Sequence, residues 1–522
     1  MDYLDYVQMT KGQRFAYKFT SFFKGIPGAI VKLFATIGYF IKKFFVSIGM
    51  FFRNYGMRFA KGDAGTKLSY IVMGAGNMMH KQFMKGLIFL ATEVAYIYFM
   101  ITFGSYYISR IYSGTVDAPI MLSSKKTKGF YRFGTGAIGS EVAVFKSTGF
   151  KEEIQNPDTY DNSNKILLFF VLTLLITIAF IAVYIANTKS AYKTQEIIAS
   201  GKKPMNFKDE MLSFLDERFH ITLLALPVLL LLTFTILPII FTIFMAFTNY
   251  DEKHQPPSTL YQWVGFKNFA DVFYSNPMKS ETFGKILIWT LIWAVFATFT
   301  NFIFGIILAL MINKKGIKFK GFWRTMFVVT AAVPQFVTLL LMNLLFRDDG
   351  SINLMISAAV GHTVTIKWIT DPLLAKIFVI VVNMWVGVPY TMLITSGLLM
   401  NIPEDLYESA RIDGANAVQQ FTKITLPYIF FVTTPYLITT FVGNINNFNV
   451  IYLLTGGGPA STDYYQAGQT DLLVTWLYKL TVTQKDYNLA AVIGIMVFIL
   501  CATGSLITFN MSKASKNEEE FS

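Results

Sequence analysis

Long apolar runs alternate with short polar segments through most of the chain. Eight of these runs carry few charges and are near or above the length of about 20 residues that a helix needs to cross a bilayer core of about 30 Å. The predicted membrane-spanning helices cover residues 85–108, 166–187, 221–248, 285–312, 326–346, 375–400, 428–452 and 488–511. The pattern therefore predicts an all-α polytopic membrane protein with about eight transmembrane helices.

Residues 11–60 follow a different pattern. Apolar residues recur there every three or four positions, but lysines interrupt them, so no uncharged stretch reaches spanning length. This spacing is typical of an amphipathic helix that lies in the cytoplasmic membrane interface with its lysines toward anionic lipid. We expect it to break near Pro27 and to act as a membrane anchor, with a regulatory role, partner docking or a ninth span as alternatives. The apolar positions are Phe15, Phe19, Phe22, Ile26, Ile30, Leu33, Ile37, Ile41, Phe44 and Ile48.

Basic residues fall on alternate connections between the predicted spans. They are frequent before the first span, then between residues 189 and 208, and again between residues 314 and 324. Because cytoplasmic loops carry an excess of Lys and Arg, this distribution places both termini and the second, fourth and sixth connections in the cytoplasm. The 109–165 connection conflicts with this, since its lysines at 125–128 would be outside, but it is long and also carries acidic residues.

Composition supports a membrane location and excludes several classes of protein. Charged residues make up 15% of the 522 positions, against roughly 25% in soluble domains, and the mean hydropathy is +0.46. The net charge of +13 fits cytoplasmic flanks and lipid headgroups better than nucleic acid, so we expect membrane lipid and no nucleic acid among the partners. A single cysteine, Cys501, excludes an intrachain disulfide, and four scattered histidines suggest no metal site. The acidic start, without a cleavage site behind a short apolar core, indicates no secretory signal.

The segment between the sixth and seventh predicted spans, residues 401–427, has the features of a surface helix–turn–helix. Pro403 suits the first turn of a helix, and the two acids that follow it match the helix dipole. Gly414 permits the positive φ that ends a helix, and a second short helix would run over 415–424 until Pro427 stops it. Spacing alone leaves open whether this segment contacts a partner or only connects two spans.

Specific residues of this segment decide between the two. Together they resemble the EAA motif of binding-protein-dependent ABC importer permeases, in the form found in the carbohydrate-uptake branch. Further stretches agree, so that residues 220–511 are similar to the larger, eight-span permease of maltose/maltodextrin-type importers, whereas residues 1–80 lie outside the resemblance. The matching stretches are Pro403–Ala415 with Glu408-Ser-Ala410 and Gly414, Ile424–Pro427, Asn383–Tyr390, Asn444–Phe448 and Leu454–Pro459.

The resemblance implies a role for the surface segment and a set of partners. In that family the EAA helix inserts into a groove on a separate ATPase, whose closure switches the permease between inward- and outward-facing states. The ATPase-coupling residues would be Glu408, Ser409, Ala410, Asp413 and Gly414, with Glu408 paired to a basic group or, alternatively, simply solvated. The implied partners are a second permease of about six spans, two copies of the ATPase and an extracellular sugar-binding protein.

The chain itself carries no Gly-x-x-x-x-Gly-Lys-Ser/Thr loop. We therefore expect it to bind no cofactor and to catalyse no reaction, with ATP and Mg²⁺ held by the partner ATPase. This division of labour agrees with the resemblance.

Polar residues within the predicted spans are the candidate substrate contacts, because polar groups at membrane depth are costly and usually functional. Asn383, Gly387 and Tyr390 have helical i, i+4, i+7 spacing and would share one face. The resemblance assigns sugar contact to these positions, although asparagines in spanning helices also serve to hold helices together. Ala331 stands where relatives with a known maltose site have an aromatic residue, which affects the choice of sugar. The full set is Gln335, Asn383, Gly387, Tyr390, Thr440, Gly443, Asn444 and Asn447.

The sequence thus divides into four parts: a basic interfacial extension (1–80), two spans with an external loop (81–215), a six-helix permease core (216–511) and a cytoplasmic tail (512–522). The predicted location is a bacterial cell membrane, and the short 249–284 segment fits a Gram-positive relative that uses a lipid-anchored binding protein. Glu93, an acid within the first span, has no assigned role.

Three functions remain in competition. The leading prediction is the permease subunit of an ATP-driven oligosaccharide importer, for maltose or maltodextrin, or for another oligosaccharide such as a galacto-oligosaccharide. A stand-alone secondary sugar transporter is the second, and a membrane scaffold or insertase that uses the basic N-terminus is the third.

Overall fold

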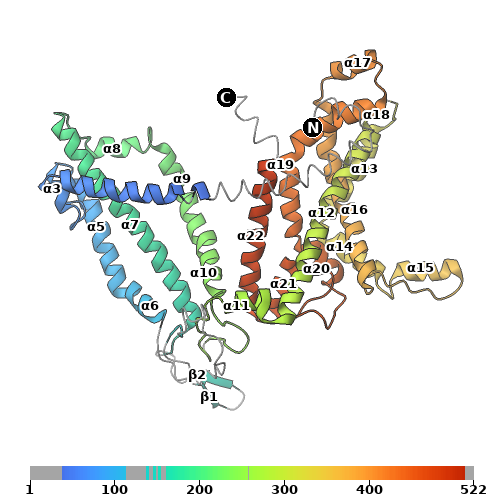
Figure 1. Cartoon of the computed structure of the whole chain (residues 1–522), viewed down its shortest axis with the longest axis horizontal. Helices are drawn as coiled ribbons and strands as arrows, with labels where there is room; N and C mark the ends of the chain where they lie inside the picture. The colour runs from blue at the N-terminus through green and yellow to red at the C-terminus, as the bar shows by residue number, and fades with distance from the viewer. Residues whose placement is uncertain are drawn as a thin grey trace. The chain divides into compact units, whose positions relative to one another are not determined.

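The computed structural model describes residues 38–40, 42–112, 137–139, 145–148, 151–154, 160–256, 258–314 and 316–511. These residues form two compact units (Figure 1). The N-terminal unit comprises residues 38–269 together with 486–491, and the core unit comprises residues 270–485 together with 492–511. The two units divide near residue 270 because each is held together by its own internal contacts. This division does not test the start of the permease core predicted at residue 216, which stays a prediction. The predicted tail and the predicted break near Pro27 lie outside the described residues.

In the described residues, seven helices are long and apolar enough to cross a membrane, and the number is eight if a bent helix pair is counted as one span. The predicted all-α polytopic class is therefore confirmed. A two-stranded antiparallel hairpin, β1 (Phe145–Thr148) paired with β2 (Lys151–Ile154), is the one sheet in the described ranges. The spans are Phe83–Arg110, Ser163–Ala199, Phe219–Met245, Pro277–Asn313, the pair Lys320–Thr330 and Gln335–Val360, Pro372–Met400, Ala417–Thr455 and Tyr487–Leu506.

The N-terminal unit is built on α5 and α7, which pack along each other, with α3, α4 and α10 against α7. A helix over residues 42–61 precedes them. The helix α7 begins where the side chain of Asn162 accepts the backbone N–H groups of Asn164 and Lys165. The elements are α3 (Ala64–Leu68), α4 (Ala75–Met79), α5 (Phe83–Phe99), η1 (Met100–Gly104), α6 (Ser105–Arg110), α7 (Ser163–Ala199), α8 (Phe207–Ser213), α9 (Phe219–Leu231), η3 (Leu232–Ile236), α10 (Leu237–Met245) and α11 (Lys267–Ala270).

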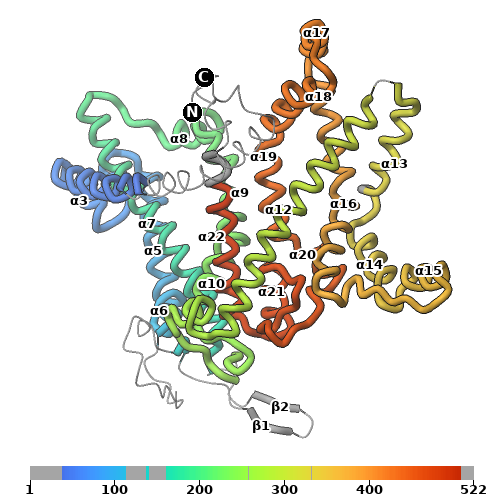
Figure 2. The backbone as a smooth tube through the Cα atoms, turned by 45° about the vertical axis from the view of Figure 1, so that its right-hand side comes forward, coloured from blue at the N-terminus to red at the C-terminus, as the bar shows by residue number. Residues whose placement is uncertain are grey.

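The core unit is organised around α12, which packs against both α16 and α19 (Figure 2). The helix α14 packs on α20, and α13 packs on α16. The elements are η4 (Asp271–Ser275), α12 (Pro277–Asn313), α13 (Lys320–Ala332), α14 (Gln335–Phe346), α15 (Ser351–Val360), α16 (Pro372–Met400), α17 (Glu404–Ile412), α18 (Ala417–Gln420), η5 (Phe421–Thr425), α19 (Leu426–Ile445), α20 (Phe448–Thr455), α21 (Leu473–Tyr478), η6 (Lys479–Thr483) and α22 (Tyr487–Met511), whose first residues belong to the N-terminal unit.

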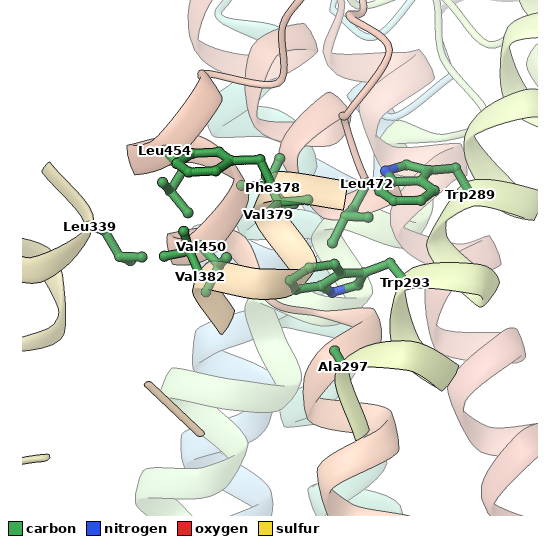
Figure 3. Packing of buried hydrophobic residues seen from close by; sticks show 11 residues of the cluster. Trp289, Trp293, Ala297, Leu339, Phe378, Val379, Val382, Val450, Leu454 and Leu472 are labelled. Atoms are coloured by element: carbon green, nitrogen blue, oxygen red, sulfur yellow. The ribbon is translucent and has the colours of Figure 1, made fainter. Parts of the chain in front are cut away.

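Two tryptophans fix the packing of α12 in the core unit (Figure 3). Trp289 and Trp293 are buried with apolar residues of α14, α16 and α20, and each also satisfies its indole N–H. Trp289 Nε1 donates to the carbonyl oxygen of Thr470 at 3.1 Å, and Trp293 Nε1 donates to that of Asn444 at 3.0 Å. The Trp293 bond holds α12 close to the C-terminal end of α19, and the Trp289 bond holds it to the loop before α21.

Two predicted spans are broken where continuous helices were expected. In the fifth span the chain bends by 77° between residues 320–330 and 335–360, because Pro334 lacks an N–H and holds Val333 in an extended conformation. In the seventh span α19 ends at Ile445, and the side chain of Asn447 caps the new helix α20 by accepting the N–H of Val450 at 3.3 Å. Both breaks place a polar residue at a helix end within a predicted span, Gln335 in the fifth and Asn447 in the seventh.

The prediction that Pro427 stops a helix is wrong. The π-helical turn η5 precedes it, and the N–H of Leu426 bonds to the carbonyl of Phe421, five residues back. A π-turn widens the helix and accommodates the proline ring, so that η5 continues directly into α19 with Pro427 in its first turn. The same arrangement occurs at Pro238, which follows η3 at the start of α10.

Candidate functional site

A cavity of about 300 Å³ lies within the core unit between α12, α14, α16 and α19. Its walls are built mainly from amide, hydroxyl and aromatic side chains of spanning helices. Among the described residues that line it, none carries a formal charge. The lining residues are Thr298, Asn301, Phe302, Gln335, Asn383, Val386, Gly387, Tyr390, Thr391, Tyr436, Leu437, Thr440 and Asn444.

Two amides in this cavity have unused hydrogen-bonding atoms. Asn301 is 8% exposed and Asn383 is 5% exposed, and Oδ1 of the first and Nδ2 of the second are buried without a hydrogen-bond partner in the structure. Leaving such a group unpaired costs about 1–3 kcal/mol. One atom accepts and the other donates, which is the pair of functions that an alcohol hydroxyl can satisfy.

Gly387 makes room for one of these amides. A Cβ atom built at Gly387 would lie 2.1 Å from Nδ2 of Asn301, so any side chain there would displace the asparagine. Thr391, one turn further along α16, donates from its hydroxyl to the carbonyl of Gly387 at 3.1 Å. The missing side chain of Gly387 thus allows α12 to present Asn301 to the cavity.

Six of the eight predicted substrate residues line this one cavity: Gln335, Asn383, Gly387, Tyr390, Thr440 and Asn444. Gln335 reaches it as the first residue of α14, directly after the break at Pro334. The remaining two, Gly443 and Asn447, lie next to it in sequence but outside its lining. The side chain of Ala331 lies outside the described residues.

Asn444 and Asn447 are already engaged with other groups of the chain. Asn444 Nδ2 donates to the hydroxyl of Thr298 at 3.0 Å, and its Oδ1 accepts Nδ2 of Asn447 at 3.3 Å. Asn447 uses its own Oδ1 to cap α20. The two asparagines therefore brace α12, α19 and α20, and of the two only Asn444 faces the cavity.

Sequence reasoning missed Asn301, Thr298 and Tyr436. Asn301 is an amide inside the predicted span 285–312, and that position alone marks it as a candidate. Tyr436 lies 6.5 Å from Tyr390 between ring centroids, so the two rings form one aromatic wall. That pairing joins two helices and has no local signal in the sequence.

The surface segment has the predicted helix–turn–helix form. The helix α17 is followed by Gly414 at φ +74°, and α18 begins with a capping box in which Asn416 and Gln419 exchange side-chain and backbone hydrogen bonds. The hydroxyls of Tyr407 and Thr425 lie 2.8 Å apart and fasten α17 to η5. Figure 2 shows α17 projecting from one end of the core unit, opposite α21.

The coupling residues predicted in this segment lie at the surface. Glu408, Ser409, Asp413 and Gly414 are exposed, and Ala410 is partly buried. Apolar side chains of the same segment are open as well: Ile412 is 87% exposed and Val418 is 64% exposed. Such a surface suits contact with an apolar groove on another protein.

Glu93 serves a local purpose in the N-terminal unit. Its carboxylate accepts the backbone N–H of Met73 at 2.8 Å and so holds the loop between α3 and α4 against α5. No group of three or more His, Cys, Asp or Glu side chains suited to a metal ion occurs in the part of the chain that the structure describes.

The spanning helices of the described residues, the neutral polar cavity of the core unit and the exposed helix pair at one end of that unit define the features of a membrane permease. A family model described as "Binding-protein-dependent transport system inner membrane component" matches residues 301–515. The chain belongs to this family of ABC importer permeases, in the carbohydrate-uptake branch and among its larger, maltose/maltodextrin-type members.

Three curated relatives show the extent of the similarity. The galactooligosaccharides transport system permease protein GanP of Bacillus subtilis is 34% identical, over 86% of this chain and 97% of GanP. The maltodextrin transport system permease protein MdxF of the same organism is 37% identical, over 74% of this chain and 90% of MdxF. The maltose/maltodextrin transport system permease protein MalF of Vibrio vulnificus is 38% identical, over 49% of each chain.

Among solved structures, a bacterial ABC transporter involved in the import of the acidic polysaccharide alginate is similar to this chain. The identity is 24% and the TM-score is 0.46, over 59% of this chain and 98% of that one.

Proposed function

We propose that the chain is the larger membrane subunit of an ATP-driven importer that takes up maltodextrin. The names of the relatives support an oligosaccharide, since MdxF is a maltodextrin permease, MalF is a maltose/maltodextrin permease and GanP is a galactooligosaccharide permease. Galacto-oligosaccharide is the alternative substrate that the same relatives favour. Family membership argues against a stand-alone secondary transporter.

The observation that carries this proposal is the neutral, amide-lined cavity of the core unit. Asn301 and Asn383 offer an unpaired acceptor and an unpaired donor, and Tyr390 and Tyr436 offer aromatic faces. Sugars present hydroxyls that both donate and accept and C–H faces that pack on aromatic rings. A volume of about 300 Å³ is at the lower end of the roughly 300–1,000 Å³ usual for small-molecule sites. This chain therefore contributes one wall of a site for part of an oligosaccharide.

Energy and directionality come from partners in this proposal. The exposed helix α17, with Glu408 on it, enters a groove on an ATPase, two copies of which hold ATP and Mg²⁺. A second permease of about six spans completes the pathway, and an extracellular binding protein delivers the sugar. The chain itself holds no cofactor.

The same framework gives sidedness. The surface segment faces the cytoplasm together with both termini, and residues 216–511 form the permease core. The chain matches GanP over 97% of GanP's length but MalF of Vibrio vulnificus over only 49% of MalF's length, which supports a Gram-positive cell membrane.

Reconstitution tests the proposal directly. The complete transporter, assembled in proteoliposomes with its binding protein, should hydrolyse ATP faster with maltotriose or longer maltodextrins and should accumulate the sugar. If galacto-oligosaccharide stimulated ATP hydrolysis and maltodextrins did not, galacto-oligosaccharide would be the substrate. Uptake driven by an ion gradient in the absence of the ATPase would overturn the proposal.

The cavity is tested by replacing its unpaired amides. The variants Asn301→Ala and Asn383→Ala should each weaken sugar-stimulated transport by about tenfold, in line with about 1–3 kcal/mol for a buried hydrogen bond to a substrate. Asn446→Ala is the matched control, because Asn446 is exposed and outside the cavity lining. Unchanged transport in both cavity variants would show that the sugar binds elsewhere.

A further inference from the structure

The helix over residues 42–61 of the N-terminal unit has two distinct faces. At 100° per residue, its aromatic side chains share an arc of about 120°, and its basic side chains lie outside that arc. The sequence from residue 38 to residue 62 contains no acidic residue. The aromatic face carries Phe44, Phe45, Phe51, Phe52, Tyr55 and Phe59, and the opposite face carries Lys42, Lys43, Arg53 and Lys61.

One end of the aromatic face packs on Tyr70, in the turn after α3, and reaches the spanning helix α7 through the hydroxyl of Tyr55. The ring of Tyr55 lies 4.9 Å from that of Tyr70, and the ring of Phe59 lies 5.1 Å from it. The hydroxyls of Tyr55 and Tyr184 are 3.1 Å apart, and Tyr184 donates to the carbonyl oxygen of Tyr70 at 2.8 Å. Tyr184 lies on α7, so the aromatic face is turned toward a membrane-spanning helix.

Polar contacts fix the direction of the helix at the same end. Gln195 of α7 donates from Nε2 to the carbonyl oxygen of Lys61 at 3.2 Å and accepts the N–H of Asp63 at 3.0 Å. Asp63 also bonds to His80 at 2.7 Å and caps α3 through the N–H of Thr66. Figure 1 shows the helix running across α5 and α7 rather than along them.

The other end of the aromatic face is not covered by any other part of the chain that the structure describes. Phe44, Phe45 and Phe52 are 62–65% exposed, on the same side of the helix as Tyr55, which is partly buried, and Phe59, which is 48% exposed. Aromatic side chains exposed to water over about two and a half helical turns are unfavourable. Because the same face reaches the spanning helix α7 at its other end, its exposed part points toward the lipid that surrounds α7.

We propose that this helix lies on the cytoplasmic surface of the bilayer and binds anionic lipid. Phe44, Phe45 and Phe52 then enter the boundary between headgroups and acyl chains, and Lys42, Lys43 and Arg53 contact lipid phosphates. A bilayer is favoured over a protein partner because the face is both aromatic and turned toward α7, because acidic residues are absent, and because the helix is transverse to the spans. The contacts at Tyr55 and Gln195 make the helix a rigid arm that sets the depth of the N-terminal unit in the membrane.

Site-specific labelling of the complete transporter tests this arm, because Cys501 is the single cysteine of the chain. In a Cys501→Ser background, Phe44→Cys and Val46→Cys are labelled with a fluorophore in proteoliposomes. The two positions are on opposite faces of the helix, and both native side chains are apolar and exposed, so they form a matched pair. Brominated phospholipid should quench the label at position 44 and aqueous iodide should quench the label at position 46.

Equal quenching by iodide at both positions would show a helix free in water and would overturn the proposal. Protection of position 44 from both quenchers would show a covering protein instead, with the same consequence. The lipid class is tested by comparing vesicles of phosphatidylcholine alone with vesicles that also contain phosphatidylglycerol. Quenching by brominated lipid at position 44 should rise by at least about twofold with the anionic lipid, and Lys42→Gln with Lys43→Gln should abolish the rise. An identical signal in both vesicles would exclude recognition of anionic lipid.

Discussion

The cavity and the surface segment over residues 401–427 lie in the same unit, yet each leaves a different kind of group without a partner. In the cavity, buried amide atoms of Asn301 and Asn383 have no hydrogen bond. In the surface segment, side chains such as Asn416 satisfy the helix ends, and apolar side chains such as Ile412 remain open. A buried polar atom calls for a polar ligand, whereas an exposed apolar side chain calls for an apolar groove.

The kind of group left without a partner therefore distinguishes the ligand expected in the cavity from the one expected at the surface segment. The cavity fits a small neutral molecule rich in hydroxyls, and the surface segment fits a protein. Variants that damage one region should therefore leave the binding in the other intact.

The largest effect is expected from reversing the charge on the surface helix. Glu408→Lys would face the ATPase with the wrong charge, and like-charge contact costs several kcal/mol, so sugar-stimulated ATP hydrolysis should fall by about 100-fold. Sugar binding to the assembled permease should be unchanged, because Glu408 is exposed and belongs to the surface segment. ATPase rate and sugar binding, measured on the same preparation, check both statements.

Glu217→Lys is the matched control for Glu408→Lys. It makes the same charge change at another exposed position on the predicted cytoplasmic side, outside the surface segment. It should leave ATP hydrolysis within about twofold of the wild type, since surface substitutions away from special features change little. If Glu408→Lys also kept normal coupling, the surface segment would not be the ATPase contact.

The second effect concerns the cavity. Gly387→Ala places a Cβ atom where Asn301 now lies, and overpacking of this kind costs about 1–3 kcal/mol. Sugar uptake should fall by about 30-fold, while attachment of the ATPase stays normal. Gly397→Ala on the same helix is the control, since a Cβ there meets no atom within 4 Å. Equal uptake in the two variants would mean that the position of Asn301 does not matter.

The third effect returns to the surface segment. Gly414 has φ +74° with open space around it, so that Gly414→Ala adds conformational strain of about 1–2 kcal/mol but no collision. The affinity for the ATPase should fall by about tenfold, and Gly414→Asn should recover much of the loss because Asn tolerates this conformation. Co-purification of the ATPase at graded detergent concentrations ranks the wild type, Gly414→Asn and Gly414→Ala by affinity. If Gly414→Asn bound the ATPase more weakly than Gly414→Ala, the positive φ at this position would not be what the contact requires.

The surface segment could be predicted from the sequence because its determinants are local. Pro403, Gly414 and the Asn416–Gln419 capping box act within a few residues of where they stand. The error at Pro427 arose because a π-turn absorbs the proline, and such a turn has no clear pattern of apolar residues.

The cavity was only partly predictable because half of it depends on contacts between helices. Asn383 and Tyr390 follow from helical periodicity along α16. Asn301 enters only because Gly387, far away in sequence, lacks a side chain at the crossing of α12 and α16. Such pairings depend on the relative placement of helices, which periodicity does not give.

The smallest loss of uptake is expected at Asn447, which lies next to the cavity in sequence. Its side chain caps a helix, as Asn416 does in the surface segment, so it tests whether a residue beside the cavity acts as a cap or as a sugar contact. Its side chain caps α20, and loss of a cap costs about 1 kcal/mol, so Asn447→Ala should lower uptake by about fivefold. Serine also caps helices but has no amide. Asn447→Ser should therefore restore uptake and thermal stability together if the residue acts as a cap. If Asn447→Ser instead recovers stability without recovering uptake, the amide touches the sugar, and the cavity extends beyond Asn444 in the transporting state.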